Sequence, residues 1–121
     1  MRLPSVLVVD DDPDQVAMLA LLLREADYRV ETATNPLYAL TLAAEFSPEV
    51  VLLDIGLPEM NGYEVLARLK RSFPRARFYA ITGRSEEEVR SKALEAGFHG
   101  YFLKPLDFEV IERVLQEHPA A

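Results

Sequence analysis

The sequence predicts a doubly wound α/β fold, in which helices cover both faces of a parallel sheet. Strand and helix patterns alternate five times along the 121 residues, as they do in successive βα units. The apolar runs are short, rich in β-branched residues and bounded by turn residues, which is typical of buried parallel strands. The strands are expected near residues 5–9, 28–33, 49–53, 77–81 and 100–103.

The first two helices begin with capping signals. Asp12 precedes Pro13 and Asn35 precedes Pro36, so each pair places a capping side chain before a proline at the first helical position. The first helix then carries apolar residues at helical spacing, which predicts one buried stripe of packing residues: Val16, Leu19, Leu22 and Leu23.

The fourth helix has signals at both ends. Ser85 offers a hydroxyl cap before three glutamates, whose charges complement the helix dipole. The helix is expected to run to Ala96 and to stop at Gly97, because glycine readily adopts the left-handed conformation that ends helices.

Length and charge limit the classes of function. The chain fits a single domain, residues 1–121, and its short ends leave no room for an attached output module, so any output must use the surface of this domain. With 20 acidic and 13 basic residues the net charge is -7, which argues against direct binding to nucleic acid or anionic membranes. The absence of cysteine, of a signal peptide and of a long apolar run predicts a cytoplasmic location.

Polar side chains follow four of the predicted strands. Asp10, Asp11 and Asp12 follow the first strand, and three further polar residues follow later strands: Asp54, Thr82 and Lys104. The carboxyl ends of parallel strands meet at one edge of the sheet, where ligands of open α/β sheets bind. Carboxylates suit Mg²⁺, while a hydroxyl and an ammonium suit phosphate oxygens. The sequence therefore predicts a site for a hard cation and a phosphoryl group.

These segments resemble the receiver domain of two-component response regulators over essentially the whole chain. The matching segments are VLVVDDD, VVLLDIGLPEMNGYEVL, AITG and GYFLKP, which are specific together, in this order and at these intervals. The resemblance implies a flavodoxin-like (βα)5 fold with strand order 2-1-3-4-5. It also implies a phosphoryl group received from a histidine kinase or a histidine phosphotransfer protein, and a downstream protein target. The segment DIGLPEMNGYEVLARLK is similar to receivers of hybrid histidine kinases, so both an excised domain and a free-standing protein remain open.

The resemblance also assigns roles around the metal. Asp54 corresponds to the phosphoacceptor, a carboxylate nucleophile that forms an acyl phosphate. Asp10, Asp11 and Asp54 correspond to the Mg²⁺ ligands, together with the backbone carbonyl of Gly56. Asp12 is an extra acid whose place before a proline favours helix capping.

Three more residues match the family pattern. Thr82 corresponds to the switch hydroxyl, and Lys104 corresponds to the cation that binds the phosphoryl group. Tyr101 corresponds to the aromatic residue whose ring moves inward when the threonine shifts, although packing alone would also explain this tyrosine. The resemblance further implies a cis bond between Lys104 and Pro105. Gly83 stands where the family usually has alanine or another small residue, so this departure is mild.

Other residues are expected to be structural. The turn Leu57-Pro58-Glu59-Met60-Asn61-Gly62 has the composition of a fixed loop, and His99 and His118 are expected at the surface, so the donor histidine belongs to another protein. Such a domain catalyses its own phosphorylation and dephosphorylation but does not turn over an external substrate.

Two rival functions stay open. The first is a Mg²⁺-dependent aspartyl-phosphate phosphatase, which would need a general acid where this chain has Gly56. The second is a pseudo-receiver, a module that docks proteins without taking a phosphoryl group, which would not need a matching residue at every position of the phosphorylation site. Flavin binding is disfavoured, because no Ser/Thr-rich phosphate loop follows the first strand.

Overall fold

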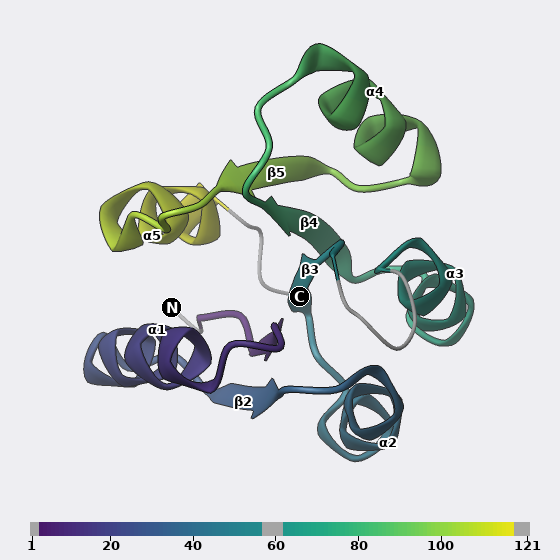
Figure 1. Ribbon diagram of the computed structural model, residues 1–121. Helices are drawn as coiled ribbons and strands as arrows, with labels where there is room; N and C mark the ends of the chain where they lie inside the picture. The colour runs from purple at the N-terminus through teal and green to yellow at the C-terminus, as the bar shows by residue number, and fades with distance from the viewer. Residues whose placement is uncertain (1–2, 57–61, 118–121) are drawn as a thin grey trace.

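A computed structural model describes residues 3–56 and 62–117, which form a five-stranded parallel sheet with helices on both faces (Figure 1). The elements are β1 (Val6–Val9), α1 (Pro13–Glu25), β2 (Val30–Ala33), α2 (Pro36–Phe46), β3 (Val50–Asp54), α3 (Gly62–Ser72), β4 (Arg77–Thr82), α4 (Glu87–Ala96), β5 (Gly100–Leu103) and α5 (Phe108–Glu117). The strand order is β2-β1-β3-β4-β5 and each pairing is parallel, so the predicted fold class and topology are confirmed. The predicted turn at residues 57–61 lies outside the described residues.

Both faces of the sheet are buried. Figure 1 shows α1 and α5 on one face and α2, α3 and α4 on the other. Successive residues of β1 point to opposite faces, so that Val6 and Val8 pack beneath α1 and α5, while Leu7 and Val9 pack beneath α2 and α3. This two-sided burial explains why the strands are continuous apolar runs rather than alternating ones.

The predicted caps of the first two helices are confirmed. Asp12 Oδ1 accepts hydrogen bonds from the backbone N–H groups of Asp14 at 3.0 Å and Gln15 at 3.3 Å. Asn35 Oδ1 accepts one from the N–H of Tyr38 at 2.8 Å. Each cap satisfies backbone donors that lack partners inside the helix, which contributes about 1 kcal/mol to stability.

Several boundaries differ from the prediction by one or two residues, and local contacts explain two of them. The Ser85 cap is wrong: the first helical hydrogen bonds of α4 are accepted by the carbonyl of Glu86, which is therefore the N-cap, and its side chain caps no described N–H. The strand predicted from residue 28 begins at Val30, because the N–H of Tyr28 bonds the carbonyl of Leu23 at 3.0 Å and so completes the end of α1. The predicted stop at Gly97 is confirmed, with φ of 112°.

Candidate functional site

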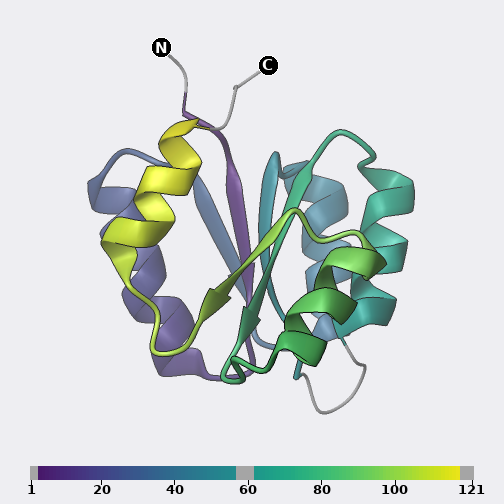
Figure 2. The same ribbon diagram turned by 90° about the horizontal axis from the view of Figure 1, so that it is seen from above.

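The polar residues predicted from the sequence meet at one edge of the sheet. Figure 2 shows the strands running the same way, with their carboxyl ends together at the lower edge. Asp10 follows β1, while Asp54 and Thr82 are the last residues of β3 and β4. Lys104 follows β5, and its N–H donates a hydrogen bond to the carbonyl of Thr82 at 2.8 Å. The topology therefore brings together side chains that are up to 94 positions apart.

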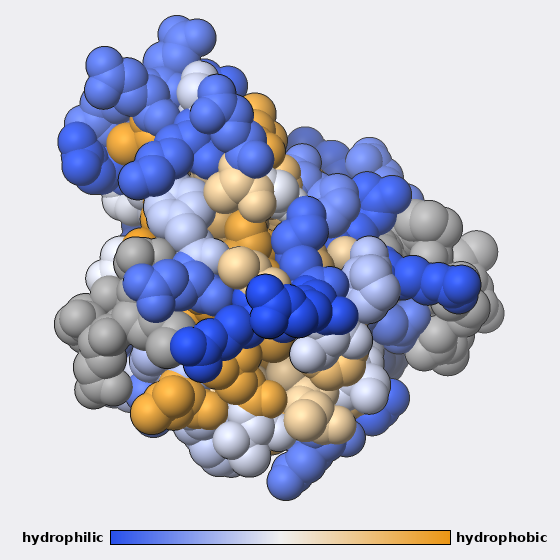
Figure 3. Space-filling model, turned by 90° about the vertical axis from the view of Figure 1, so that its right-hand side faces the viewer, coloured by the Kyte–Doolittle hydropathy of each residue, from blue (hydrophilic) through white to orange (hydrophobic). Residues whose placement is uncertain are grey.

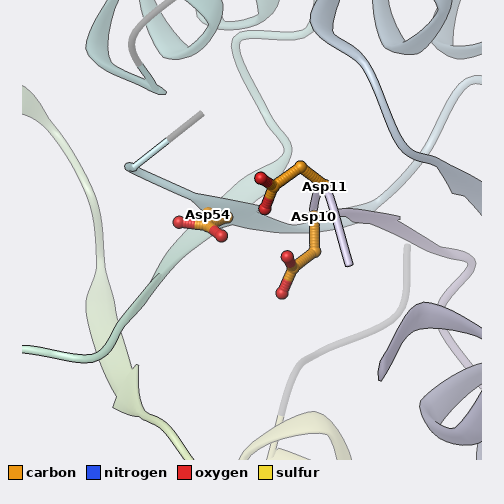
Figure 4. A group of neighbouring side chains, drawn as sticks. All are labelled: Asp10, Asp11 and Asp54. Atoms are coloured by element: carbon orange, nitrogen blue, oxygen red, sulfur yellow. The ribbon is translucent and has the colours of Figure 1, made fainter. Parts of the chain in front are cut away.

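Three carboxylates face a common space at this edge (Figure 4). Asp10, Asp11 and Asp54 each offer one oxygen, and these oxygens lie within 4.8 Å of one another. Asp10 and Asp54 are buried, with 0% and 6% of their surface exposed, whereas Asp11 is exposed. The exposed side chain leaves the cluster open to solvent on one side, so that a cation can reach it.

Lys104 bridges the two buried carboxylates. Its Nζ donates a hydrogen bond to Asp54 Oδ2 at 2.9 Å and lies 3.1 Å from Asp10 Oδ2. Partial burial lowers the pKa of Lys104, but the hydrogen bonds and charges of Asp54 and Asp10 outweigh it, and the pKa is raised overall. The ammonium therefore stays protonated and offsets part of the repulsion between the carboxylates.

The pKa of Asp10 is shifted by its surroundings. Burial raises its pKa from 3.8 to about 6, and the charge of Asp54 adds to the rise, while hydrogen bonds from the backbone N–H of Asp12 and from Lys104 oppose it. Asp10 Oδ2 accepts no hydrogen bond of good geometry from any described residue, despite its distance from Lys104 Nζ. A buried oxygen without a hydrogen bond is costly, and a hard cation would supply the missing partner. The donor set thus fits Mg²⁺.

Glycines shape the approach to Asp54. The N–H of Gly56 donates a hydrogen bond of 2.7 Å to Asp54 Oδ1 and so fixes that carboxylate. At Gly62 a Cβ atom would lie 2.5 Å from the Cα of Ile55 and 2.8 Å from the carbonyl oxygen of Asp54. Only glycine lets the first turn of α3 pack this closely against the end of β3, which agrees with a structural role.

Thr82 is engaged with the loop that leads into α4. Its side chain is buried, and Oγ1 accepts a hydrogen bond of 3.0 Å from the backbone N–H of Arg84. The hydroxyl lies 3.5 Å from the carbonyl oxygen of the same residue. A cavity of about 450 Å³ beside Asp54 and Thr82 extends to Tyr63 and Lys92. The sequence signals gave no indication of the Thr82–Arg84 contact.

Tyr101 lies on the same side of the sheet as α4. It is half-buried against the core beneath α2, α3 and α4, and the Cζ of Arg90 lies 5.0 Å from the centre of its ring. The cation over the ring is a contact that strand patterning could not reveal, because it joins residues of different elements.

Two further expectations are confirmed nearby. The bond between Lys104 and Pro105 is cis, and His99 is exposed. The ring of His99 also has a structural role, since its Nδ1 accepts a hydrogen bond of 3.0 Å from the N–H of Phe78.

Solved structures share this architecture. Chemotaxis protein CheY4 of Vibrio cholerae superimposes with a TM-score of 0.86 at 27% identity, covering 95% of this chain and 98% of that one. The receiver domain of DrrB activated by BeF3 gives 0.83 at 30% identity, covering 95% and 97%. A response regulator of Burkholderia pseudomallei with a phosphorylated aspartic acid, a calcium ion and citrate gives 0.86 at 31% identity, covering 94% and 67%. Fold and site thus define a CheY-like protein.

The chain belongs to the response regulator receiver domain family of two-component signalling, whose family model matches residues 6–116. An uncharacterized 14.6 kDa protein of Leptolyngbya boryana is 35% identical over 117 residues, or 94% of this chain and 88% of the relative. Transcriptional regulatory protein ZraR of Klebsiella oxytoca is 38% identical over 113 residues, covering 93% of this chain and 26% of the regulator. KdpE of Mycobacterium tuberculosis is 38% identical over 104 residues, covering 86% and 46%. The chain therefore spans less than half of either regulator. None of its described helices is long and apolar enough to cross a membrane.

Proposed function

We propose that residues 1–121 form a single receiver domain that takes a phosphoryl group from a phosphohistidine onto Asp54. The observation that carries this proposal is the buried Asp54 carboxylate, which lies at the carboxyl edge of β3 beside Asp10, Asp11 and Lys104. An Asp54 oxygen attacks phosphorus, the phosphorus–nitrogen bond breaks, and the imidazole nitrogen keeps the bonding electron pair. The product is an acyl phosphate on Asp54.

The surrounding side chains have separate roles in this proposal. Lys104 pairs with Asp54 before transfer and then binds a phosphoryl oxygen, for which its 2.9 Å contact is well placed. The Gly56 N–H orients Asp54 Oδ1, so that the other oxygen can act as the nucleophile once Lys104 turns to the phosphoryl group. The Thr82 hydroxyl donates to another phosphoryl oxygen after leaving Arg84.

The acidic residues are proposed to hold Mg²⁺. Its ligands would be Asp10, Asp11, Asp54 and the carbonyl of Gly56. The support is Asp10 Oδ2, a buried oxygen that accepts no hydrogen bond from any described residue, within a cluster whose oxygens lie within 4.8 Å of one another. Bound Mg²⁺ supplies positive charge that neutralises the carboxylates and the arriving phosphoryl group.

The partner is proposed to be a histidine kinase or a histidine phosphotransfer protein acting in the cytoplasm, with a downstream protein as the target. An apolar groove of about 340 Å³ beside the site gives such a partner a place to dock, and Met18, Leu22, Leu106 and Phe108 are among its lining residues. The chain has no cysteine, which suits a reducing compartment.

The test of the phosphoacceptor is intact mass spectrometry after incubation with Mg²⁺ and phosphoramidate. We expect one added phosphoryl group in the wild-type protein and none in Asp54→Asn. Asp12→Asn is the matched control, because it removes a charge from the same loop but only caps α1, and it should still be phosphorylated. Phosphorylation of Asp54→Asn at the wild-type rate would overturn the assignment.

The switch is proposed to join the site to the surface of α4, β5 and α5 through Thr82 and Tyr101. When Thr82 turns toward the phosphoryl group, it vacates space that the Tyr101 ring can enter. Amide NMR with Mg²⁺ and beryllium trifluoride should then show shifts in residues 85–96 and 101–113. Shifts confined to the loops around Asp10, Asp54 and Lys104 would contradict this switch.

A further inference from the structure

Helix α4 is held to the molecule by little hydrophobic burial. Of its ten residues, all of which the structure describes, only Ala93 is buried, whereas α1, α2 and α3 each bury four. Figure 3 looks onto the face of α2, α3 and α4, and hydrophilic residues cover most of the block at its top, where α4 lies. Because burial energy scales with apolar area, the buried Ala93 and the half-buried Val89 anchor α4 only weakly.

Two cations of α4 lie over aromatic rings of neighbouring elements. Arg90 Cζ is 5.0 Å from the ring centre of Tyr101 in β5, and Lys92 Nζ is 4.9 Å from the ring centre of Tyr63 in α3. Residues two apart point about 200° apart around a helix, so the two cations flank the buried Ala93. One contact ties α4 to the sheet and the other ties it to α3.

The two ends of α4 are fixed differently. At the carboxyl end, Lys70 Nζ donates a hydrogen bond of 3.0 Å to the carbonyl of Gly97, and Phe98 packs edge-on against Tyr63 with 6.1 Å between ring centres. At the amino end, the Glu86 side chain makes no helix-capping hydrogen bond, and its Oε1 lies 3.4 Å from the guanidinium group of Arg84. That end follows the loop that the Thr82 hydroxyl holds through Arg84.

We propose that Arg90 and Lys92 are positioning residues that lower the population of the switched arrangement. Their cation–π contacts with Tyr101 and Tyr63 hold α4 in its present place. This inference rests on the proposed function. When Thr82 turns to the phosphoryl group, its hydroxyl gives up the N–H of Arg84 and frees the amino end of α4. The Tyr101 ring can move into the space that Thr82 vacates only by breaking its contact with Arg90. Arg90 therefore favours the arrangement of the domain without a phosphoryl group.

The test measures binding of beryllium trifluoride, with Mg²⁺ present, by NMR titration. Exposed cation–π contacts are weak, so Arg90→Gln should raise the population of the switched arrangement, and hence the apparent affinity, about two- to fivefold. Arg90→Lys keeps a cation and should restore most of the wild-type affinity. Arg71→Gln makes the same charge change at an exposed position of α3, outside these contacts, and should leave the affinity unchanged.

Two more readouts separate positioning from mere support. The ring signals of Tyr101 in free Arg90→Gln should move toward their positions in the beryllium trifluoride complex of the wild-type protein. Lys92→Gln should also tighten binding, because it loosens α4 from Tyr63. A loss of stability in urea without a change in affinity or in the Tyr101 signals would overturn the inference and leave the proposed function standing. Failure of the wild-type protein to bind beryllium trifluoride would overturn both.

Discussion

One ammonium stands between two buried carboxylates at the centre of the site. Like charges about 4 Å apart repel by roughly 4 kcal/mol at an effective dielectric constant of 20, so Asp10 and Asp54 would destabilise the metal-free fold if they were left alone. The sequence indicates this repulsion but not how it is opposed. Lys104 opposes it, because its Nζ lies within 3.1 Å of an oxygen of each carboxylate.

Replacing Lys104 by methionine should therefore destabilise the metal-free protein. We expect a loss of about 1–3 kcal/mol, less than for a fully buried pair, because the Lys104 side chain is 27% exposed. Urea unfolding in EDTA measures the change. Adding Asp54→Asn to this variant should recover stability, since it removes one of the two unpaired carboxylates. Equal stability of Lys104→Met and the wild-type protein would contradict the bridge.

His99 provides a pH-dependent contribution to stability. Partial burial lowers the pKa of its ring, and the charges of Arg77 and Lys70 lower it further. The unfolded chain, with an ordinary pKa near 6.5, therefore takes up a proton first as the pH falls. The stability that neutral His99 contributes is present above pH 6.5 and is lost as the pH falls below it.

We expect the difference in stability between the wild-type protein and His99→Gln to shrink from pH 7.5 to pH 5. Urea unfolding at each pH measures this difference, and comparison of the two proteins cancels the titration of the carboxylates they share. An NMR titration that gave the His99 ring a pKa above 6.5 would refute the prediction.

At the scale of elements, local signals locate helices and strands well, because caps and turns are chemistry between near neighbours. Asp12 and Asn35 cap the helices that their prolines begin, and Gly97 ends α4. Ser85 is not the cap because the same sequence, a serine before three acids, is compatible with a helix whose first accepting carbonyl is that of Ser85 or that of Glu86. In the structure the carbonyl of Glu86 accepts the first helical hydrogen bonds, and no short-range signal distinguishes these two starts.

Contacts between elements are what the sequence could not supply. The positions of Asp54 and Thr82 could be predicted because each residue ends a strand. The hydrogen bond from the Arg84 N–H to Thr82 and the cation–π contact of Arg90 with Tyr101 could not, because they depend on how α4 lies across the sheet. Two exposed basic residues in an amphipathic helix carry no pattern that identifies the ring beneath each one.

The end of α4 gives a test at this scale. At Gly97, φ is 112° and an added Cβ would meet the side chain of Lys70, so Gly97→Ala should cost about 1–2 kcal/mol or more. Gly83→Ala is the matched control, because no described atom lies within 4 Å of its added Cβ, and it should change stability by less than about 0.5 kcal/mol. Urea unfolding compares the two, and equal losses would contradict the role of Gly97.

For the molecule as a whole, charge is unevenly distributed. The net charge is -7, yet residues 65–85 contain six basic residues and no acidic one, so the acids concentrate elsewhere, including the site edge. Any added cation will therefore stabilise the domain to some extent by screening. A specific metal site must be distinguished from this general effect.

Mg²⁺ should stabilise the domain beyond NaCl of equal ionic strength. A cation that binds the folded cluster but not the unfolded chain stabilises by about 1.4 kcal/mol for each tenfold excess over its dissociation constant. Asp11→Asn should lose most of this extra stabilisation, because it removes one of the three converging carboxylates. Asp14→Asn makes the same charge change at an exposed position of α1 outside the cluster and should keep it. Thermal unfolding in both salts measures the difference. If both variants respond to Mg²⁺ as the wild-type protein does, the ion acts through net charge and the three carboxylates do not form its site.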